Sequence, residues 1–322
     1  MKGKWTYIVC VLGMISLLVT GCASSKQDKT AENSSGHYLQ MTDDVGRSIV
    51  LEKKPQRIVV LSTSFLDVLY GVGGQAVGRP SSKTPQALPG QQEVPEIGFV
   101  YNVNVEKVLA LQPDLVIGFQ GIHDKLVPTF ESSNIPVMIL KMKTYDEILE
   151  KITLFGKIAG TEEHAQKLIA VMEERIHQVT SKLPEKSKKV VILHATAKNV
   201  TVELENTIAG NVASILKLTN IAAGSTPLAG DNEVTPYSLE KLVEGDPDAI
   251  LVVTMGNMDE IEKRMQADIE SNPAWNGLRA VKNKQVFFLP ADLFLLNPGI
   301  RFHESVEYMA KVMYPEVYGN VK

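Results

Sequence analysis

Short hydrophobic runs alternate with amphipathic stretches along most of the chain. An uninterrupted apolar run bounded by turn residues predicts a buried strand, and apolar residues at helical spacing predict a covering helix. Val105, Val108 and Leu109 have that helical spacing between two such runs. Strands that alternate with helices are typical of an α/β fold with a parallel sheet. The predicted strands are Arg57–Leu61, Leu115–Gly118, Val137–Leu140, Lys189–Leu193, Ile250–Val253 and Val286–Leu289.

Two successive helical patterns separate the first three predicted strands from the last three. Thr144 and Glu147 have the spacing of a capping box, which predicts a helix running toward Gly160. A longer amphipathic stretch runs from Thr161 to the helix breaker Pro184. The pattern therefore predicts an α/β protein with two Rossmann-like lobes and parallel-rich sheets. A single long helix joins the lobes, and the ligand cleft lies between them.

The first 22 residues have the pattern of an export signal. Lys2 and Lys4 precede an apolar run, Ile8–Val19, which is too short to span a bilayer comfortably. The run leads into Val19–Cys22, which resembles the lipobox of bacterial lipoproteins. That resemblance implies cleavage before Cys22 and diacylation of its thiol, and two acyl chains anchor a protein to a membrane. The alternative is an ordinary signal peptide with a chance cysteine.

Composition and charge narrow the class of protein further. The 322 residues, 44% of them hydrophobic, suffice for two ordinary lobes. The only cysteines are Cys10, inside the signal, and Cys22, so disulfides, Cys/His zinc sites and thiol catalysis are excluded from the mature chain. Acidic residues outnumber basic ones 37 to 33, which excludes a basic surface for nucleic acid. We expect a protein anchored by lipid at the outer face of the bacterial cytoplasmic membrane.

The predicted organisation has five parts. A stretch without aromatic or large aliphatic residues, from Ala23 to Gly36, predicts a flexible tether behind the signal. The parts are a signal peptide (1–21), a tether (22–40), an N-terminal lobe (41–143), linker helices that include the inter-lobe helix (144–184) and a C-terminal lobe (185–322).

A gapless internal repeat supports two similar lobes. Residues 105–117, VEKVLALQPDLVI, match residues 239–251, LEKLVEGDPDAIL. Each copy predicts a short helix, a Pro-Asp turn and a buried strand. The alternative is chance similarity between two common α/β pieces. Because open α/β sheets bind ligands at the carboxyl ends of their strands, two such lobes favour a ligand between them.

Several segments together resemble a known family. These segments are Thr42–Arg47, Pro55–Leu61, the two repeat copies and Asn297–Arg301. On their basis, the chain from about Met41 onward resembles the class III substrate-binding proteins of ABC importers. This resemblance implies two α/β lobes bridged by a rigid helix, no enzymatic activity and no catalytic cofactor. It also implies a monomer that captures a ferric siderophore, haem or cobalamin and delivers it to a permease.

The repeat also contains paired acidic residues. The resemblance implies that Glu106 and Glu240, one in each lobe, dock onto arginines of the permease dimer. Two carboxylates on matching surfaces can recognise a two-fold symmetric partner by charge complementarity. The alternative is that each carboxylate only stabilises the N-terminus of its own helix.

Polar residues near the predicted strand ends are candidate ligand groups. Ser62, Thr63 and Ser64 can donate hydrogen bonds to a ligand carboxylate, or cap the predicted helix Phe65–Gly71. His194 follows a strand and is either an iron ligand or a structural histidine.

The apolar segment after Asp292 ends in two further candidates, Arg301 and His303. The arginine can pair with a haem propionate or an anionic siderophore, or with the neighbouring Glu304.

Two residues are candidate ligands for haem iron. Tyr101 and Met255 occupy the places of the methionine and histidine ligands in a haem-receptor lipoprotein that the chain resembles. A phenolate is a known ligand of ferric haem, whereas a thioether favours the reduced iron. The alternatives are a surface tyrosine and a methionine that forms an apolar cleft wall.

Haem ranks first among the ligands because few positive charges accompany the candidate residues. Neutral hydroxamate siderophores and cobalamin remain alternatives, whereas a triscatecholate siderophore would require several basic residues. A bare metal ion would depend on His123, His194 and His303, which no HxH or HExxH spacing joins. The motifs G-x-S-x-G, P-loop and G-x-G-x-x-G after a strand are absent from the sequence, so nothing indicates an enzyme.

Overall fold

The structure, a computed structural model, describes residues 36–82 and 88–321, and within them leaves out the side chains of residues 268–270. The predicted signal, Cys22 and most of the predicted tether lie outside the described residues. The chain from His37 onward forms one compact unit. Its first strand, β1 (Leu39–Thr42), begins two residues before Met41, where the sequence analysis placed the start of the lobe.

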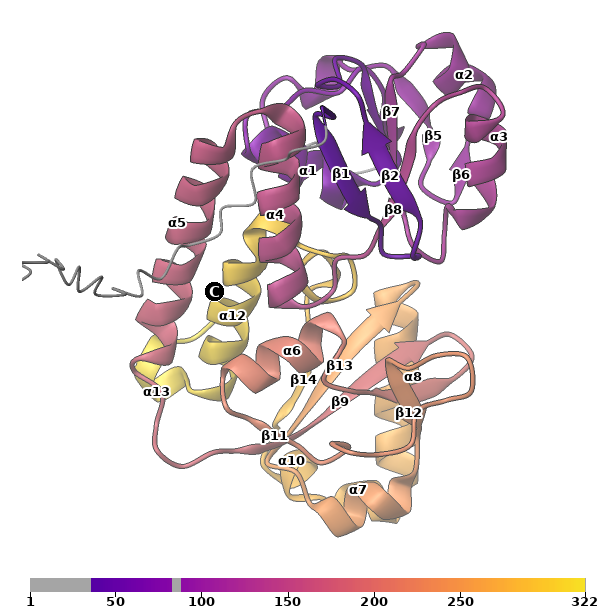
Figure 1. Ribbon diagram of the computed structural model, residues 1–322. Helices are drawn as coiled ribbons and strands as arrows, with labels where there is room; N and C mark the ends of the chain where they lie inside the picture. Colours follow the sequence, from indigo (N-terminus) through magenta and orange to yellow (C-terminus); the bar gives the residue numbers. More distant parts are fainter. Residues whose placement is uncertain (1–35, 83–87, 322) are drawn as a thin grey trace, which may run out of the picture. The chain divides into compact units, whose positions relative to one another are not determined.

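The N-terminal lobe is built on a parallel sheet with the strand order β3 (Ile58–Val60), β7 (Leu115–Phe119), β8 (Val137–Leu140) (Figure 1). These strands are buried almost throughout, which explains their uninterrupted hydrophobic runs. A smaller sheet and a hairpin complete the lobe. The sheet contains β4 (Arg79–Ser81), β5 (Glu96–Phe99) and β6 (Asn102–Val103), and the hairpin pairs β1 with β2 (Ser48–Leu51).

The C-terminal lobe contains a mixed sheet. Its strand order is β12 (Val234–Pro236), β10 (Val200–Glu203), β9 (Lys189–Thr196), β13 (Ala249–Met255), β14 (Val286–Phe288), and β11 (Thr219–Asn220) pairs with β9. Strands β9, β13, β14 and β11 run parallel, as the sequence predicts for the first three. The antiparallel strands β10 and β12 are short and partly polar, so hydrophobic periodicity does not reveal them.

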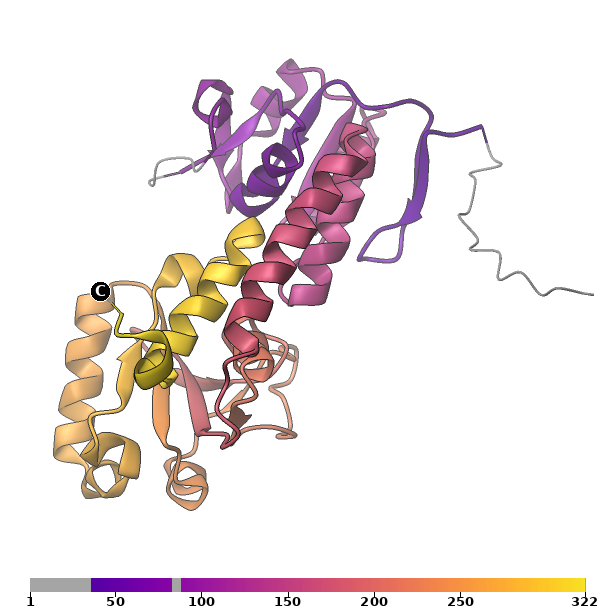
Figure 2. The ribbon, with the colours of Figure 1, turned by 90° about the vertical axis from the view of Figure 1, so that its left-hand side faces the viewer.

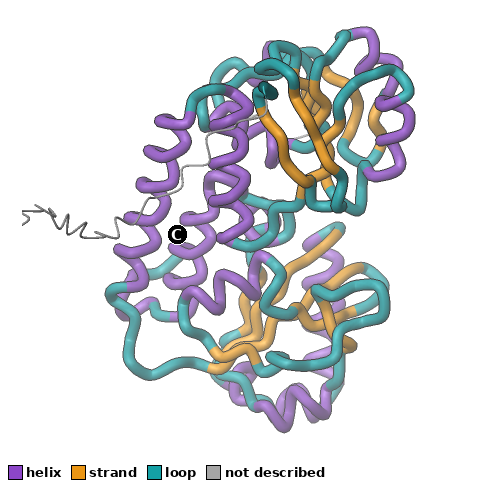
Figure 3. The backbone as a smooth tube through the Cα atoms, in the orientation of Figure 1, coloured by secondary structure: helices purple, strands orange, loops and turns teal. Residues whose placement is uncertain are grey.

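Three helices run beside the two sheets and connect the lobes (Figures 2 and 3). The predicted capping box at Thr144 and Glu147 is present at the start of α4 (Tyr145–Ala159). The predicted long helix is α5 (Glu162–Thr180), which packs against both α4 and α12 (Phe302–Met313). In the described part of the chain, no helix is both long and apolar enough to cross a bilayer.

The remaining helices are shorter or flank the sheets. They are α1 (Thr63–Gly71), α2 (Val105–Ala110), α3 (Val127–Glu131), α6 (Ile208–Ile215), α7 (Leu239–Gly245), α8 (Met258–Ser271), α9 (Pro273–Gly277), α10 (Arg279–Lys282), α11 (Ala291–Phe294) and α13 (Pro315–Tyr318), with 3-10 turns η1 (Gln91–Glu93), η2 (Asp124–Leu126) and η3 (Gly299–Arg301).

One hydrophobic cluster extends through both lobes. It joins Phe65 of α1 and Phe155 of α4 to Met172 and Ile176 of α5, and continues through α12 to α6 and one face of the C-terminal sheet. Separate clusters cover the other face of each sheet. Because one face of α5 packs in this continuous core, bending the helix would break apolar packing, and large hinge motion between the lobes is disfavoured.

The internal repeat has the same helix cap in both lobes. Asn104 accepts a hydrogen bond from the backbone N–H of Lys107 and caps α2. Ser238, at the equivalent position, accepts one from Lys241 and caps α7. The short helices α2 and α7 therefore both begin with a polar N-cap side chain that accepts from the third residue after it, as the sequence match predicts.

Candidate ligand-binding cleft

Residues of both sheets line a cavity of about 530 Å³, a volume in the range of small-molecule sites. The N-terminal lobe contributes residues at the ends of β3, β7 and β8 and at the β5–β6 turn. The C-terminal lobe contributes β9, β10 and the loop that precedes β12. Of the predicted ligand residues, Ser62, Thr63, Ser64, Tyr101 and His194 line this cavity.

The serine cluster lies at the N-terminus of α1. Ser62 occupies the N-cap position but makes no side-chain cap hydrogen bond, so the alternative role of helix capping is not observed for it. Ser64 Oγ donates to the carbonyl oxygen of Asn297 at 2.9 Å, and Asn297 Nδ2 in turn donates to the carbonyl oxygen of Met142. This arrangement joins three chain segments at the base of the cavity. Ser62 and Thr63 keep their hydroxyls available for a ligand.

Tyr101 lies at the tip of the β5–β6 hairpin, with 79% of its surface exposed. The hairpin is held by His123, a buried residue that the sequence offered only as a metal ligand. Its Nδ1 accepts from the backbone N–H of Phe119 and its Nε2 donates to the carbonyl oxygen of Val100, both at 2.8 Å. Both ring nitrogens are therefore occupied. Burial lowers the pKa of His123, which keeps the ring neutral.

His194 and Glu203 form the centre of the C-terminal-lobe wall. His194 Nδ1 lies 3.1 Å from Oε1 of Glu203, whose side chain is only 5% exposed. The hydrogen bond to Glu203 raises the pKa of His194, and the charges of Asp231 and Glu233 act in the same direction. Successive side chains of a strand point to opposite faces of the sheet. Val191 and Leu193 of β9 belong to the core cluster on one face, so His194 points to the other face, where the cavity lies.

Sequence analysis missed the acidic residues of this wall. Glu203 ends β10, and the register pairs it with Val234 of β12. Asp231 and Glu233 precede that strand, and the backbone N–H of Glu233 donates to Asp231 Oδ1 at 3.0 Å. All three line the cavity. Single acids next to short strands carry no sequence signal, because only the antiparallel pairing of β10 and β12 brings them together.

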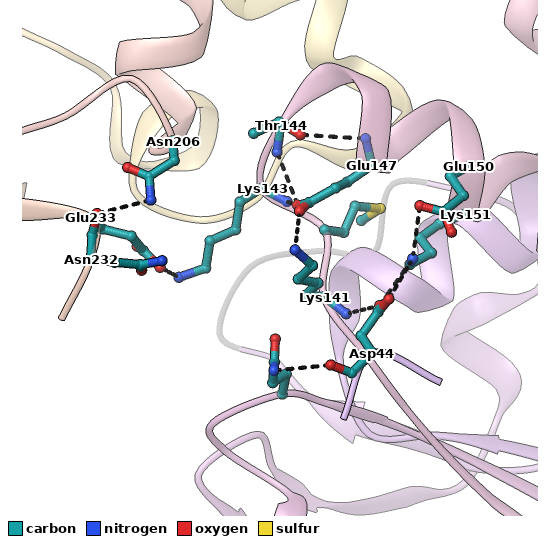
Figure 4. Close-up of polar contacts among 12 residues, drawn as sticks. Asp44, Lys141, Lys143, Thr144, Glu147, Glu150, Lys151, Asn206, Asn232 and Glu233 are labelled. Carbon is teal, nitrogen blue, oxygen red and sulfur yellow. Dashed lines mark hydrogen bonds and ion pairs between the residues drawn. The ribbon is translucent and has the colours of Figure 1, made fainter. Parts of the chain in front are cut away.

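Lys143 supplies the positive charge among the acidic residues of the cavity. It follows β8 and precedes the capping residue of α4, and its Nζ contacts Glu233 Oε1 of the other lobe (Figure 4). Its backbone N–H donates to Glu147 Oε2 at 2.8 Å, which fixes the chain where the side chain leaves it. Nearby, the buried Lys151 pairs with Asp44 at 2.9 Å. Lys143 therefore links the linker helices to the C-terminal-lobe wall.

Three predicted ligand residues lie outside the cavity lining. Met255 ends β13, is 52% exposed and pairs in register with Thr196, which does line the cavity. Arg301 forms ion pairs with Asp292 at 3.2 Å and Glu304 at 2.9 Å, as in the alternative interpretation.

His303, the third of them, is 9% exposed on α12, and burial lowers its pKa. Among the described side chains, no group of three or more His, Cys, Asp or Glu residues could hold a metal ion. The bare-ion alternative therefore has no ligand set in the described part of the protein.

Glu106 and Glu240 occupy equivalent positions in the first turns of α2 and α7, and both are exposed. Neither carboxylate forms an ion pair with another described residue. The two helices lie in different lobes (Figure 1). Both carboxylates are thus accessible, and both also lie where a helix N-terminus favours negative charge.

Comparison with known proteins identifies the family. Residues 58–293 match the periplasmic binding protein family, and the chain belongs to this family. The Fe(3+)-citrate-binding protein YfmC of Bacillus subtilis is 26% identical over 329 residues, covering 98% of each chain. The uncharacterized ABC transporter substrate-binding lipoprotein YvrC of the same organism is 24% identical over 330 residues, again covering 98% of each.

A solved structure confirms the predicted two-lobed α/β fold. The crystal structure of Staphylococcus aureus IsdE complexed with heme superposes with a TM-score of 0.69 at 24% identity, covering 80% of this chain and 98% of that one. The family is one of binding proteins, in agreement with the prediction that the chain is not an enzyme.

Proposed function

We propose that the protein is the extracytoplasmic substrate-binding subunit of an ABC importer and that it captures an iron chelate for delivery to the permease. The observation that carries the proposal is the cavity of about 530 Å³ lined by residues of both lobes. Relatives named for ferric citrate binding and for ABC substrate binding support it. Cys22 would carry the lipid anchor at the outer face of the cytoplasmic membrane, and Glu106 and Glu240 would dock the loaded monomer onto the permease.

Haem is the first candidate chelate. Tyr101 lines the cavity with an exposed phenol that can bind ferric iron. Met255 lies beside the lining residue Thr196, at the edge from which a second iron bond could come.

Ferric hydroxamates are the second candidate, and the charges of the cavity favour them. Haem carries two propionates, whereas the C-terminal-lobe wall presents Glu203, Asp231 and Glu233. Arg301, the predicted partner for an anionic ligand, is engaged by Asp292 and Glu304. A chelate without excess negative charge avoids this electrostatic cost.

The test is a panel of chelates titrated into the soluble part of the chain, residues 23–322. Absorption would follow haemin, and calorimetry would follow a neutral ferric hydroxamate, ferric citrate and cobalamin. Saturable binding of one iron chelate supports the proposal. If the Soret band of bound haem changes position in Tyr101→Phe but not in Tyr237→Phe, the Tyr101 phenolate is a ligand of the haem iron. Absence of binding by every member of the panel would remove the proposed function.

A further inference from the structure

The charged side chains on the cavity wall are unevenly distributed. Three carboxylates, Glu203, Asp231 and Glu233, lie on the C-terminal-lobe wall. The cavity lining otherwise holds one lysine, Lys143, and one histidine, His194. Even with both of these carrying a proton, the wall keeps an excess of one negative charge. Such a wall repels anions and attracts a single cation.

Glu203 adds a second and independent observation. Its side chain is 5% exposed, and Oε1 is used by His194. The other oxygen, Oε2, is buried and has no hydrogen-bond partner among the described residues. A buried carboxylate oxygen without a donor is costly. Because Glu203 lines the cavity, a turn of its side chain toward a bound ligand would give Oε2 a donor that arrives with that ligand.

The neighbouring acids cannot satisfy Glu203 themselves, because carboxylates only accept hydrogen bonds when ionised. Glu233 already contacts Lys143, and Asp231 accepts from the backbone N–H of Glu233. Within the described side chains there is also no set of three ligands for a bare metal ion. A ligand group that carries its own N–H donors and a positive charge matches all of these conditions.

We propose that Glu203, with Asp231 and Glu233, forms a subsite for an ammonium group of the bound chelate. The protein then prefers a hydroxamate chelate that carries a free amine over neutral and anionic chelates. This inference rests on the proposed function, because it names the substrate class of the same cavity. The chelated iron occupies the N-terminal-lobe side, near Tyr101, and the ammonium group points to the acidic wall.

Ferrioxamine B tests the inference because its iron centre is neutral and its free end is an ammonium group. N-acetylated ferrioxamine B has the same iron centre with a neutral amide in place of that group. Calorimetry on residues 23–322, which include the entire compact unit from His37 onward, would compare both with ferric citrate and haemin. We expect ferrioxamine B to bind at least tenfold more tightly than its acetylated form, a difference of about 1.4 kcal/mol.

Substitutions test whether the acids of the C-terminal-lobe wall cause the preference for ferrioxamine B over its acetylated form. Glu203→Gln, Glu233→Gln and Asp231→Asn should each reduce it at least threefold, while leaving the acetylated chelate nearly unaffected. Glu185→Gln is the matched control, because Glu185 is an exposed acid that does not line the cavity. Asp231 is itself exposed, so its variant keeps the test valid if replacement of the buried Glu203 impairs folding.

The outcomes separate this inference from the proposed function. Equal or tighter binding of the acetylated chelate overturns the ammonium subsite and leaves an iron-chelate receptor. A preference that survives in all three variants overturns its assignment to this wall. Binding of haemin or ferric citrate without either hydroxamate also overturns the subsite. If no chelate binds, the proposed function itself fails.

Discussion

The imidazole Nε2 of His123 donates to the carbonyl oxygen of Val100 at 2.8 Å, and this bond holds the hairpin tip that presents Tyr101. Close packing around the ring is visible at Gly118, where an added Cβ would come within 3.0 Å of the His123 Cβ. The position of the exposed tyrosine is therefore set by a buried residue that does not line the cavity.

His123→Ala should lower the free energy of unfolding by about 2 kcal/mol, because it leaves the half-buried N–H of Phe119 and the half-buried carbonyl of Val100 without partners. It should also weaken binding of any chelate that Tyr101 contacts. Urea unfolding and calorimetry measure the two effects. Tyr101→Ala is the control, since it should weaken binding with little change in stability. An equal loss of stability in both variants would contradict the positioning role.

Two histidines should give opposite pH dependences of stability. The pKa of His123 is lowered by burial, so the unfolded chain takes up its proton first and the stability due to His123 falls as the pH drops below about 6.5. The pKa of His194 is raised by Glu203, so its contribution is complete below about 6.5 and is lost as the pH rises through the folded value.

Urea unfolding between pH 5 and pH 8 on the wild type, His123→Ala and His194→Gln would test both signs. The gap in unfolding free energy between wild type and His123→Ala should narrow on acidification. The gap to His194→Gln should narrow on alkalinisation. If the unfolding free energy of either variant changed with pH in parallel with that of the wild type, the corresponding pKa shift would be contradicted.

The repeat predicts a further pair of effects. Asp114 accepts from the backbone N–H groups of Arg57 and Gln56, at 2.8 and 2.7 Å. Asp248, its equivalent, accepts from that of Lys189 at 2.8 Å. Each Pro-Asp turn is thus attached to the start of a strand in the sheet of its own lobe, β3 in one lobe and β9 in the other. Asp114→Ala should lower the free energy of unfolding by about 2 kcal/mol, since one net hydrogen bond contributes about 1 kcal/mol. Asp248→Ala should lower it by about 1 kcal/mol for its hydrogen bond, with less than about 1 kcal/mol more for the partly exposed ion pair of Asp248 with Arg279 at 3.0 Å.

Thermal or urea unfolding would measure the loss of stability in each repeat variant. Because Asp259 is exposed, Asp259→Ala is the control for the loss of charge alone. If neither repeat variant loses more stability than the control, the two turns do not hold their sheets together.

The sequence could predict the fold because its signals are local. Buried parallel strands are uninterrupted apolar runs, and the capping box at Thr144 is visible in four residues. The repeat was visible for the same reason: Gln112 and Asp246 both adopt positive φ before a Pro-Asp turn, so the chain needs the same short pattern twice.

Much less of the cleft could be predicted. Ser62 was found because it follows a predicted strand, and Tyr101 because it occupies the place of an iron ligand in the haem receptor that the chain resembles. Glu203 and Glu233, in contrast, meet only through the pairing of β10 with β12. Arg301 shows the opposite problem: the sequence left a ligand role and a pairing with Glu304 both open, and the structure shows the pairing with Glu304 and adds Asp292 to it.

Lys143 should control which chelate charge the cavity accepts. Its ion pair with Glu233 is about one-third exposed on each side, so Lys143→Met should change the unfolding free energy by less than about 1 kcal/mol. Removing the single lysine of the lining should tighten binding of ferrioxamine B and weaken binding of ferric citrate. Lys141→Met is the control, because Lys141 pairs with Glu147 and does not line the cavity. Calorimetry that finds the same change for both chelates would contradict this electrostatic role.

Glu106 and Glu240 should matter for delivery and leave capture unchanged. Both are exposed in the first turns of equivalent helices, and neither lines the cavity. The double variant Glu106→Gln/Glu240→Gln should therefore bind its chelate as the wild type does, yet support at least tenfold slower uptake by cells. Glu244→Gln, on α7 with Glu240, is the matched control and should transport normally. Wild-type uptake by the double variant would leave the two acids with only their effect on the helix N-termini, which the unfolding free energy would show as a loss of about 0.5 kcal/mol per site.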